Sequence, residues 1–268
     1  MGDTKGAEMT TGIVWTDTTV QIGASGLLVS RAGTGRPVVV LHREIGIPER
    51  LPFLDALAAR HDVIVPHHPG FGRSARLDWL RHPRDIAVLY QALLGELGIA
   101  SPVLIGTGFG GWIAAEMASM APAALRALVL VGAMGVKPGE GHIFDQALVN
   151  YIDYARAAFH DQSKFDAIYG ADPTTDQLEA WDICREMCFR VAWKPYMYSQ
   201  SLPHLLAGVR APSLVVWGEK DRVVPPSAGA IYAARLPGAR HEVVAECGGA
   251  VEMEQPDALL EFVSKIIG

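Results

Sequence analysis

Short, unbroken apolar runs separated by helical segments are the feature that most limits how this chain can fold. Between residue 37 and about residue 135, such runs alternate with stretches whose apolar residues recur at helical spacing. A strand that is apolar on both sides must be covered on both faces of its sheet, as in a parallel sheet flanked by helices. We therefore predict an α/β fold with strands at 38–41, 63–65, 103–105, 128–131 and 214–217.

The remaining elements fit one α/β unit with an insertion. Residues 19–22 and 27–31 have the pattern of an antiparallel hairpin at the sheet edge. A chain of 268 residues, half of them hydrophobic, can bury one full core without disulfides. The alternation stops over 136–204, where we expect helices. Apolar periodicity predicts the other helices over 49–60, 84–97, 112–120 and 257–267.

Composition narrows the classes of partner and location. The net charge is -6 with no basic stripe, so nothing indicates nucleic-acid binding. No apolar run approaches the roughly 20 residues of a membrane span, and residues 1–12 lack a signal core. Three cysteines without framework spacing favour a reducing compartment. We expect a cytoplasmic protein that binds a small molecule and no nucleotide cofactor, and we allow for a homodimer.

Several motifs follow one another in a fixed order. The apolar run 37–42 ends in His42, and 63–74 reads V-I-V-P-H-H-P-G-F-G-R-S. Residues 104–111 read L-I-G-T-G-F-G-G, 212–225 read P-S-L-V-V-W-G-E-K-D-R-V-V-P, and 246–256 read E-C-G-G-A-V-E-M-E-Q-P. This series resembles the α/β-hydrolase fold superfamily, in particular its capped esterases and carbon–carbon hydrolases. The resemblance implies a mostly parallel twisted sheet with helices on both faces and a small helical cap insertion.

The resemblance assigns roles to particular residues. Asp221 takes the place of the catalytic acid, but Gly108 stands where the nucleophile elbow G-x-S-x-G has its serine. Gly249 stands where the family has its general-base histidine. At the oxyanion turn, the usual His-Gly is replaced by a sequence that includes the charged pair Arg43 and Glu44. An aspartate without its histidine has no imidazole to orient, so ordinary serine hydrolysis is not expected.

The resemblance also implies a division of the chain into core and cap. The core would comprise 1–135 and 205–268, and the cap 136–204. The cap is rich in aromatic residues and methionine, which would suit an apolar or aromatic ligand. Alternatively, these residues only pack the cap on the sheet. The expected substrate-binding residues are Gly108, Phe109, Gly249, Trp193 and Tyr151.

Histidines offer a different chemistry. His42 ends one predicted strand, and His67 and His68 follow the next. Ligand crevices of open α/β sheets lie at the carboxyl ends of the strands, where these side chains would meet. With Glu44 they would form a ligand set for a divalent metal ion that activates water. Alternatively, His42 packs under the oxyanion turn and His67 or His68 is solvated. The candidate catalytic residues are Asp221, His42 and His67.

Three functions remain open. The first is an enzyme that uses the hydrolase scaffold on a small apolar or aromatic substrate without serine, through metal-activated water or substrate-assisted hydrolysis or lyase chemistry. The second is a non-catalytic homologue that binds a small molecule or a partner. The third is a serine hydrolase inactivated by substitution at positions 108 and 249. We expect an enzyme, and the substrate stays unassigned.

Overall fold

An eight-stranded sheet forms the centre of the protein. The computed structural model describes residues 12–48, 51–122 and 124–268. Strands follow the order β1-β2-β4-β3-β5-β6-β7-β8. The β1–β2 and β2–β4 pairs are antiparallel, and the others are parallel. The strands are β1 (Thr16–Ile22), β2 (Ser25–Ala32), β3 (Pro37–Leu41), β4 (Asp62–Pro66), β5 (Val103–Thr107), β6 (Ala127–Val131), β7 (Ser213–Gly218) and β8 (Arg240–Val244).

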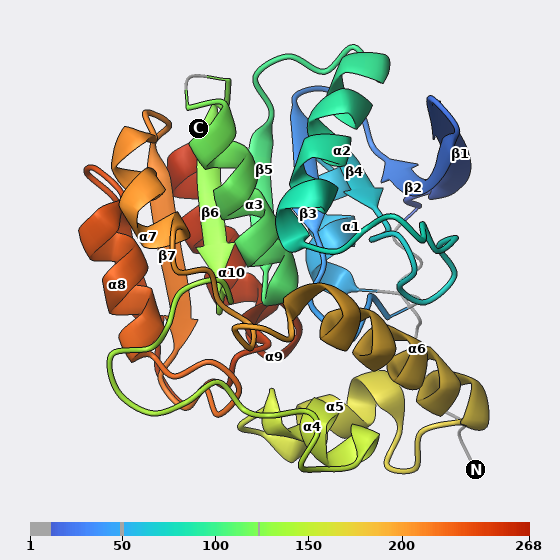
Figure 1. The fold of residues 1–268 in the computed structure, drawn as a ribbon, viewed down its shortest axis with the longest axis vertical. Helices are drawn as coiled ribbons and strands as arrows, with labels where there is room; N and C mark the ends of the chain where they lie inside the picture. Colours follow the sequence, from blue (N-terminus) through green and yellow to red (C-terminus); the bar gives the residue numbers. More distant parts are fainter. Residues whose placement is uncertain (1–11, 49–50, 123) are drawn as a thin grey trace, which may run out of the picture.

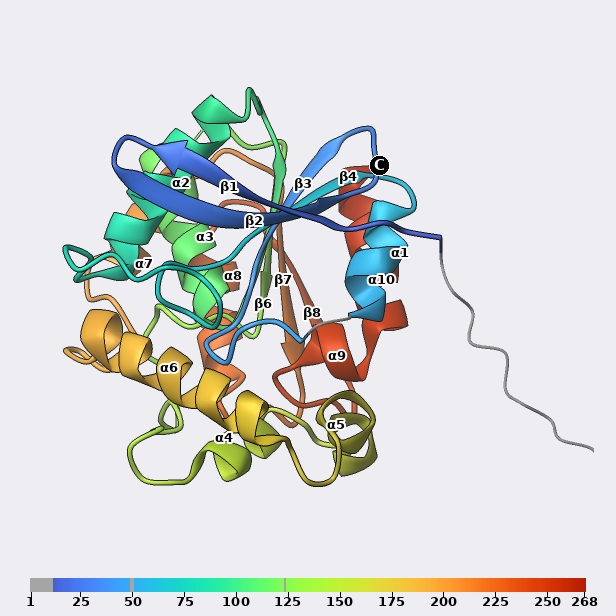
Figure 2. The same cartoon turned by 90° about the vertical axis from the view of Figure 1, so that its right-hand side faces the viewer.

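Helices cover both faces of this sheet. Figure 2 shows α1, α9 and α10 on one face and α2, α3, α7 and α8 on the other. The helices are α1 (Pro52–Ala58), α2 (Pro83–Glu96), α3 (Phe109–Met120), α4 (Tyr151–Ala157), α5 (Gln162–Tyr169), α6 (Thr175–Ala192), α7 (Leu202–Leu205), α8 (Ser227–Arg235), α9 (Val251–Glu254) and α10 (Pro256–Ile267), with the 3-10 helix η1 (Leu206–Gly208). No helix in the described ranges is both long and apolar enough to span a membrane.

The predicted α/β architecture is confirmed. The five predicted apolar runs are β3 to β7, and β4 to β7 are buried along their whole length, as strands covered on both faces must be. The predicted hairpin is β1 and β2. Strand β8 carried no signal of this kind, because it lies at the edge of the sheet and most of its side chains are accessible. Helix α3 begins at Phe109, three residues before the predicted start.

The segment between β6 and β7 contains α4, α5 and α6, which agrees with its expected helical character. Figure 1 shows these three helices together beyond the ends of β6 and β7. The segment leaves and rejoins the core at one place, because Gly135 forms a parallel β-bridge with Tyr198. Residues 136–197 therefore extend from a single point of the core, over the carboxyl edge of the parallel strands. The boundaries at 135 and 205 stay a prediction.

Candidate functional site

A tight turn joins β5 to α3 at Gly108. This residue is the N-cap of α3 and has φ 51° and ψ -119°, in the positive-φ region that favours glycine. Its neighbours must also be small: a Cβ on Gly106 would lie 2.5 Å from the carbonyl oxygen of Gly110. The strand-turn-helix geometry expected of a nucleophile elbow is therefore present around a residue without a side chain.

The carboxylate of Glu44 lies against this glycine. A Cβ added to Gly108 would clash with Glu44 Oε2 and would lie 2.9 Å from Arg43 Cβ. Glu44 Oε2 accepts a hydrogen bond from the backbone N–H of Phe109 at 3.3 Å, and Oε1 accepts one from the Tyr154 hydroxyl at 3.4 Å. The side chain is only 1% exposed. An acidic group thus fills the space in which a side chain at position 108 would stand.

Arg43 connects the two glycine positions. Its Nε donates to Glu252 Oε1 at 2.7 Å, and its Nη2 donates to the Gly249 carbonyl oxygen at 2.9 Å. Nη1 lies 3.7 Å from Glu44 Oε1. Burial works against the charged guanidinium, but Glu252 and Glu44 outweigh it and raise the pKa of Arg43 above its ordinary value. Arg43 is 2% exposed, so this is a buried ion pair and not a surface contact.

Asp221 lies against the second glycine. A Cβ on Gly249 would lie 2.6 Å from Asp221 Oδ1. Oδ1 accepts the backbone N–H groups of Val223 and Val224 at 2.8 and 2.9 Å, whereas Oδ2 is buried and has no partner among the described residues. Burial raises the pKa of Asp221 to about 7, against the opposing effect of the two N–H donors. This carboxyl group therefore holds a proton for part of the time near neutrality.

The three predicted histidines are close together, but two of them are fully engaged by the protein. His42 Nδ1 lies 2.8 Å from the Arg43 carbonyl oxygen, and its Nε2 accepts the backbone N–H of His68 at 2.9 Å. His68 contacts the Tyr90 hydroxyl at 2.8 Å and the His42 carbonyl oxygen at 2.9 Å. Burial lowers the pKa of both rings, that of His68 to about 3. These contacts match the alternative for His42, a packed structural residue, but its second part is wrong because neither His67 nor His68 is solvated: both are buried.

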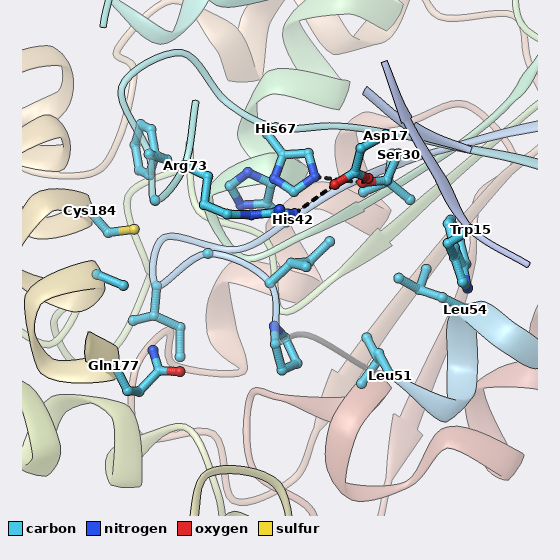
Figure 3. Close-up of a pocket in the computed structure, with 18 of the residues that line it drawn as sticks. Trp15, Asp17, Ser30, His42, Leu51, Leu54, His67, Arg73, Gln177 and Cys184 are labelled. Atoms are coloured by element: carbon cyan, nitrogen blue, oxygen red, sulfur yellow. Dashed lines mark hydrogen bonds and ion pairs between the residues drawn. The ribbon is translucent and has the colours of Figure 1, made fainter. Parts of the chain in front are cut away.

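The predicted metal ligand set is not assembled. Glu44 binds the Phe109 N–H, while His67 lies against Ser30 in a separate pocket, with its Nε2 2.8 Å from Ser30 Oγ (Figure 3). Within the described ranges, no group of three or more His, Cys, Asp and Glu side chains is arranged to hold a metal ion. The divalent metal on His42, His67, His68 and Glu44 therefore receives no support from the geometry.

The side chains of the predicted substrate-binding aromatic residues are not among the nearest neighbours of a Cβ built on Gly108. Trp193 is 51% exposed, and the Tyr151 hydroxyl donates to Asp182 at 2.5 Å. Tyr154, one helical turn after Tyr151, is the residue that reaches Glu44. The ring of Phe109 is buried against Phe71 and Trp112, and its backbone N–H, not the ring, faces Glu44. The sequence also did not predict the role of Arg43. The charged pair of Arg43 and Glu44 in the turn after β3 was the feature that could have indicated it.

The comparisons with known proteins place these features in a family. The sequence profile of the alpha/beta hydrolase fold matches residues 37–255. Polyketide synthase ThaQ of Burkholderia thailandensis is 30% identical over 86% of this chain, which corresponds to 12% of the synthase. The dihydrolipoyllysine-residue acetyltransferase component of an acetoin cleaving system of Pseudomonas putida is 29% identical over 86% of this chain and 64% of that protein. The chain thus spans less than two thirds of either relative.

Other relatives match over most of their own length. A 2-hydroxy-6-oxo-6-phenylhexa-2,4-dienoate hydrolase of Comamonas testosteroni is 26% identical, over 85% of this chain and 86% of that one. The crystal structure of a membrane phospholipase A superposes with a TM-score of 0.80 at 21% identity, covering 96% of this chain and 86% of the other. A Rhodococcus 2-hydroxy-6-oxo-6-phenylhexa-2,4-dienoate hydrolase superposes with a TM-score of 0.74 at 19% identity, covering 95% and 99%. This chain therefore belongs to the alpha/beta hydrolase fold family.

Proposed function

We propose that this protein is an enzyme that acts on a small apolar or aromatic carbonyl compound without a serine nucleophile. In this proposal, Gly108 and Gly249 stand at the serine and histidine positions of the family, and Glu44 and Asp221 supply the acid–base groups. A single observation carries it: the buried carboxylate of Glu44 lies against Gly108 and accepts the Phe109 N–H. The ring-cleavage hydrolases among the relatives indicate the class of compound to test first.

The charge of the cluster supports a chemical role. One guanidinium, that of Arg43, faces the carboxyl groups of Glu44, Glu252 and Asp221, and all four residues are buried. A buried ion pair is weak support for stability, since well-packed apolar residues of similar size are often equally or more stabilising. Buried ionisable groups with shifted pKa values are, in contrast, typical of sites that carry out chemistry. The cluster is better explained by chemistry than by packing.

The reaction follows from the two acid–base groups. Glu44 accepts a proton from a water molecule as the water oxygen bonds to the substrate carbonyl carbon. The bond from that carbon to the leaving group breaks, and the leaving group takes the proton that Asp221 carries near neutrality. Glu44 then returns its proton through solvent to Asp221, so that one water is consumed per turnover. Tyr154 on α4 covers Glu44, so substrate enters as this contact opens.

The test uses 2-hydroxy-6-oxo-6-phenylhexa-2,4-dienoate and a panel of aryl esters, with products followed by chromatography. The Glu44→Gln variant keeps the shape and a hydrogen-bond acceptor for Phe109 but loses the base, so turnover should fall by roughly 10²-fold or more. Glu261→Gln, on the surface of α10, is the matched control. Undiminished turnover in Glu44→Gln would exclude Glu44 as the base.

A second candidate is a non-catalytic homologue. This candidate is favoured because the space beside Gly108 is filled: Arg43 and Glu44 occupy it and are almost completely buried. In such a protein, the wild-type chain turns over none of the compounds in the panel, and Glu44→Gln changes nothing but stability. The same experiment therefore separates the two functions.

A further inference from the structure

A cavity lies beside the β1–β2 hairpin. Its volume is about 1010 Å³, at the upper end of the range of small-molecule sites. The hairpin, the turns after β3 and β4, and α6 form its walls (Figure 3). Among the described residues, Gly108, Asp221 and Gly249 are not part of its lining. It is therefore a separate site from the charged cluster at the elbow.

A row of four polar side chains runs along one wall. Arg73 Nη2 donates to Asp17 Oδ2 at 3.0 Å, and Ser30 Oγ lies 2.5 Å from Asp17 Oδ1. Ser30 Oγ also lies 2.8 Å from His67 Nε2. These residues come from β1, β2 and the turn after β4, and Figure 3 shows them meeting at the cavity.

The order of donors in this row fixes the tautomer of His67. The hydrogen bond from Ser30 lowers the pKa of Asp17, as does the guanidinium of Arg73, so Asp17 is an ionised acceptor at neutral pH. Ser30 has a single proton and must give it to Asp17. The short contact between Ser30 and His67 therefore needs the proton of His67 Nε2. In the neutral ring, Nδ1 is then left with a free lone pair.

The free lone pair of His67 has no partner in the part of the chain that is described. The residue is only 9% exposed, and its ring forms part of the cavity wall (Figure 3). Burial, together with the guanidinium of Arg73, lowers the pKa of His67, so the ring is neutral near pH 7. Nδ1 is not among the buried atoms that lack a partner, so solvent in the cavity reaches it and a donor there can bind it. A ligand hydroxyl in the cavity would supply that donor.

The other residues that line the cavity indicate the polarity and charge of the rest of the ligand. Apolar side chains face the cavity opposite the polar row, among them Ile45, Leu51, Leu54 and the indole of Trp15, whose N–H is already given to Asp55 at 2.7 Å. Among the described residues, the charged groups of the lining are three carboxylates (Asp17, Asp55 and Asp176) and one guanidinium (Arg73). An anionic ligand would add to this negative excess. The lining therefore favours an uncharged molecule.

We propose that this cavity binds an uncharged aromatic molecule through a hydroxyl group that donates to His67 Nδ1. Asp17 and Ser30 act as positioning residues, because they fix the proton of His67 on Nε2. The apolar body of the ligand lies against Trp15, Leu51 and Leu54. This binding site does not rest on the function proposed for the elbow, since neither Glu44 nor Asp221 takes part.

Calorimetric titration of the full chain tests this site with three probes of one shape. 2-Naphthol has the hydroxyl donor, 2-methoxynaphthalene lacks it, and 2-naphthoate carries a negative charge. We expect 2-naphthol to bind roughly tenfold more tightly than 2-methoxynaphthalene, the effect of one buried hydrogen bond, and 2-naphthoate to bind most weakly. Equal affinities for the first two, tightest binding of 2-naphthoate, or no binding would overturn the proposal.

Variants locate the contact. His67→Phe should abolish the preference for 2-naphthol, Ser30→Ala should reduce it, and the matched surface variant Ser264→Ala should leave it unchanged. Histidine ring ¹⁵N resonances of the unmodified protein provide a readout that needs no variant: His67 should be protonated on Nε2, and 2-naphthol should shift its Nδ1. An Nδ1-protonated ring would contradict the assignment. Glu44→Gln should not alter binding, which separates failure of this site from failure of the elbow proposal.

Discussion

Gly108 and Gly249 matter at the residue scale because their neighbours occupy the space that a side chain at either position would need. Glu44 and Arg43 crowd Gly108, and the Asp221 carboxyl group lies against Gly249. A serine and a histidine introduced here would meet charged, buried groups that are held by further hydrogen bonds. The surroundings of both glycines are therefore adapted to glycine, which argues against a serine hydrolase that has only lost two side chains.

This reasoning predicts the behaviour of the double variant Gly108→Ser, Gly249→His. We expect no gain of esterase activity on aryl esters, and destabilisation of roughly 1–3 kcal/mol from overpacking. Denaturant unfolding measures the stability, and a serine-directed fluorophosphonate followed by mass spectrometry reports whether Ser at 108 becomes reactive. Strong ester hydrolysis in this variant would instead support the inactivated-hydrolase hypothesis.

Between elements, a buried carboxylate connects the start of α5 to the loop that carries Gly249. Glu254, at the end of α9, accepts backbone N–H groups from Gly248 at 2.8 Å, His160 at 3.0 Å and Asp161 at 2.7 Å. Asp161 is the N-cap of α5. One side chain therefore satisfies donors at the start of α5 and in the loop before α9, and it holds the two in register.

Removal of this carboxylate should loosen the junction. In Glu254→Ala, three N–H groups lose their acceptor, and we expect a loss of roughly 2–4 kcal/mol of unfolding free energy. Hydrogen exchange should accelerate at residues 160–161 and 248, while β5 and β6 keep their protection. The exposed Glu261→Ala serves as the control, with a change within about 0.5 kcal/mol. Uniform acceleration over the whole chain would show that Glu254 has no local role.

For the whole molecule, Asp221 makes stability depend on pH in an unusual direction. The pKa of Asp221 is raised from 3.8 to about 7 in the folded protein, so the folded state binds more protons than the unfolded state between these values. The contribution of this residue to stability is therefore fully present below about pH 4 and is lost as the pH rises through about 7. Asp17, Glu219 and Glu261, whose pKa values are lowered by hydrogen bonds and nearby cations, act in the opposite direction.

The variant Asp221→Asn isolates this effect. The unfolding free energy of the variant minus that of the wild type should increase between pH 4 and pH 8, by an amount on the order of a few kcal/mol. Chemical denaturation at a series of pH values measures the difference, and Asp257→Asn, in the first turn of α10, is the control. A difference that does not change with pH would mean that Asp221 titrates normally.

The sequence predicted the scaffold much better than the site. Strands β3 to β7 could be recognised because burial on both faces requires unbroken apolar runs, and the elbow could be located from its glycines. The contacts of Arg43 could not be predicted from the sequence. They join the turn after β3 to Glu252, which is 209 residues away, and they depend on how the folded chain packs. Tyr151 was preferred over Tyr154 because sequence alone does not say which face of α4 meets the core.

The bridge between Gly135 and Tyr198 gives the chain an architecture in which one part can vary independently of the other. An insertion whose two ends meet at one point can be lengthened, shortened or exchanged without changing the register of any strand in the sheet. The inserted segment can therefore change in length while the strand register is kept, provided that contacts such as that of Tyr154 with Glu44 are maintained. Recombinant exchange of residues 136–197 with the corresponding segment of a relative becomes a practical way to change ligand preference while keeping the folded core.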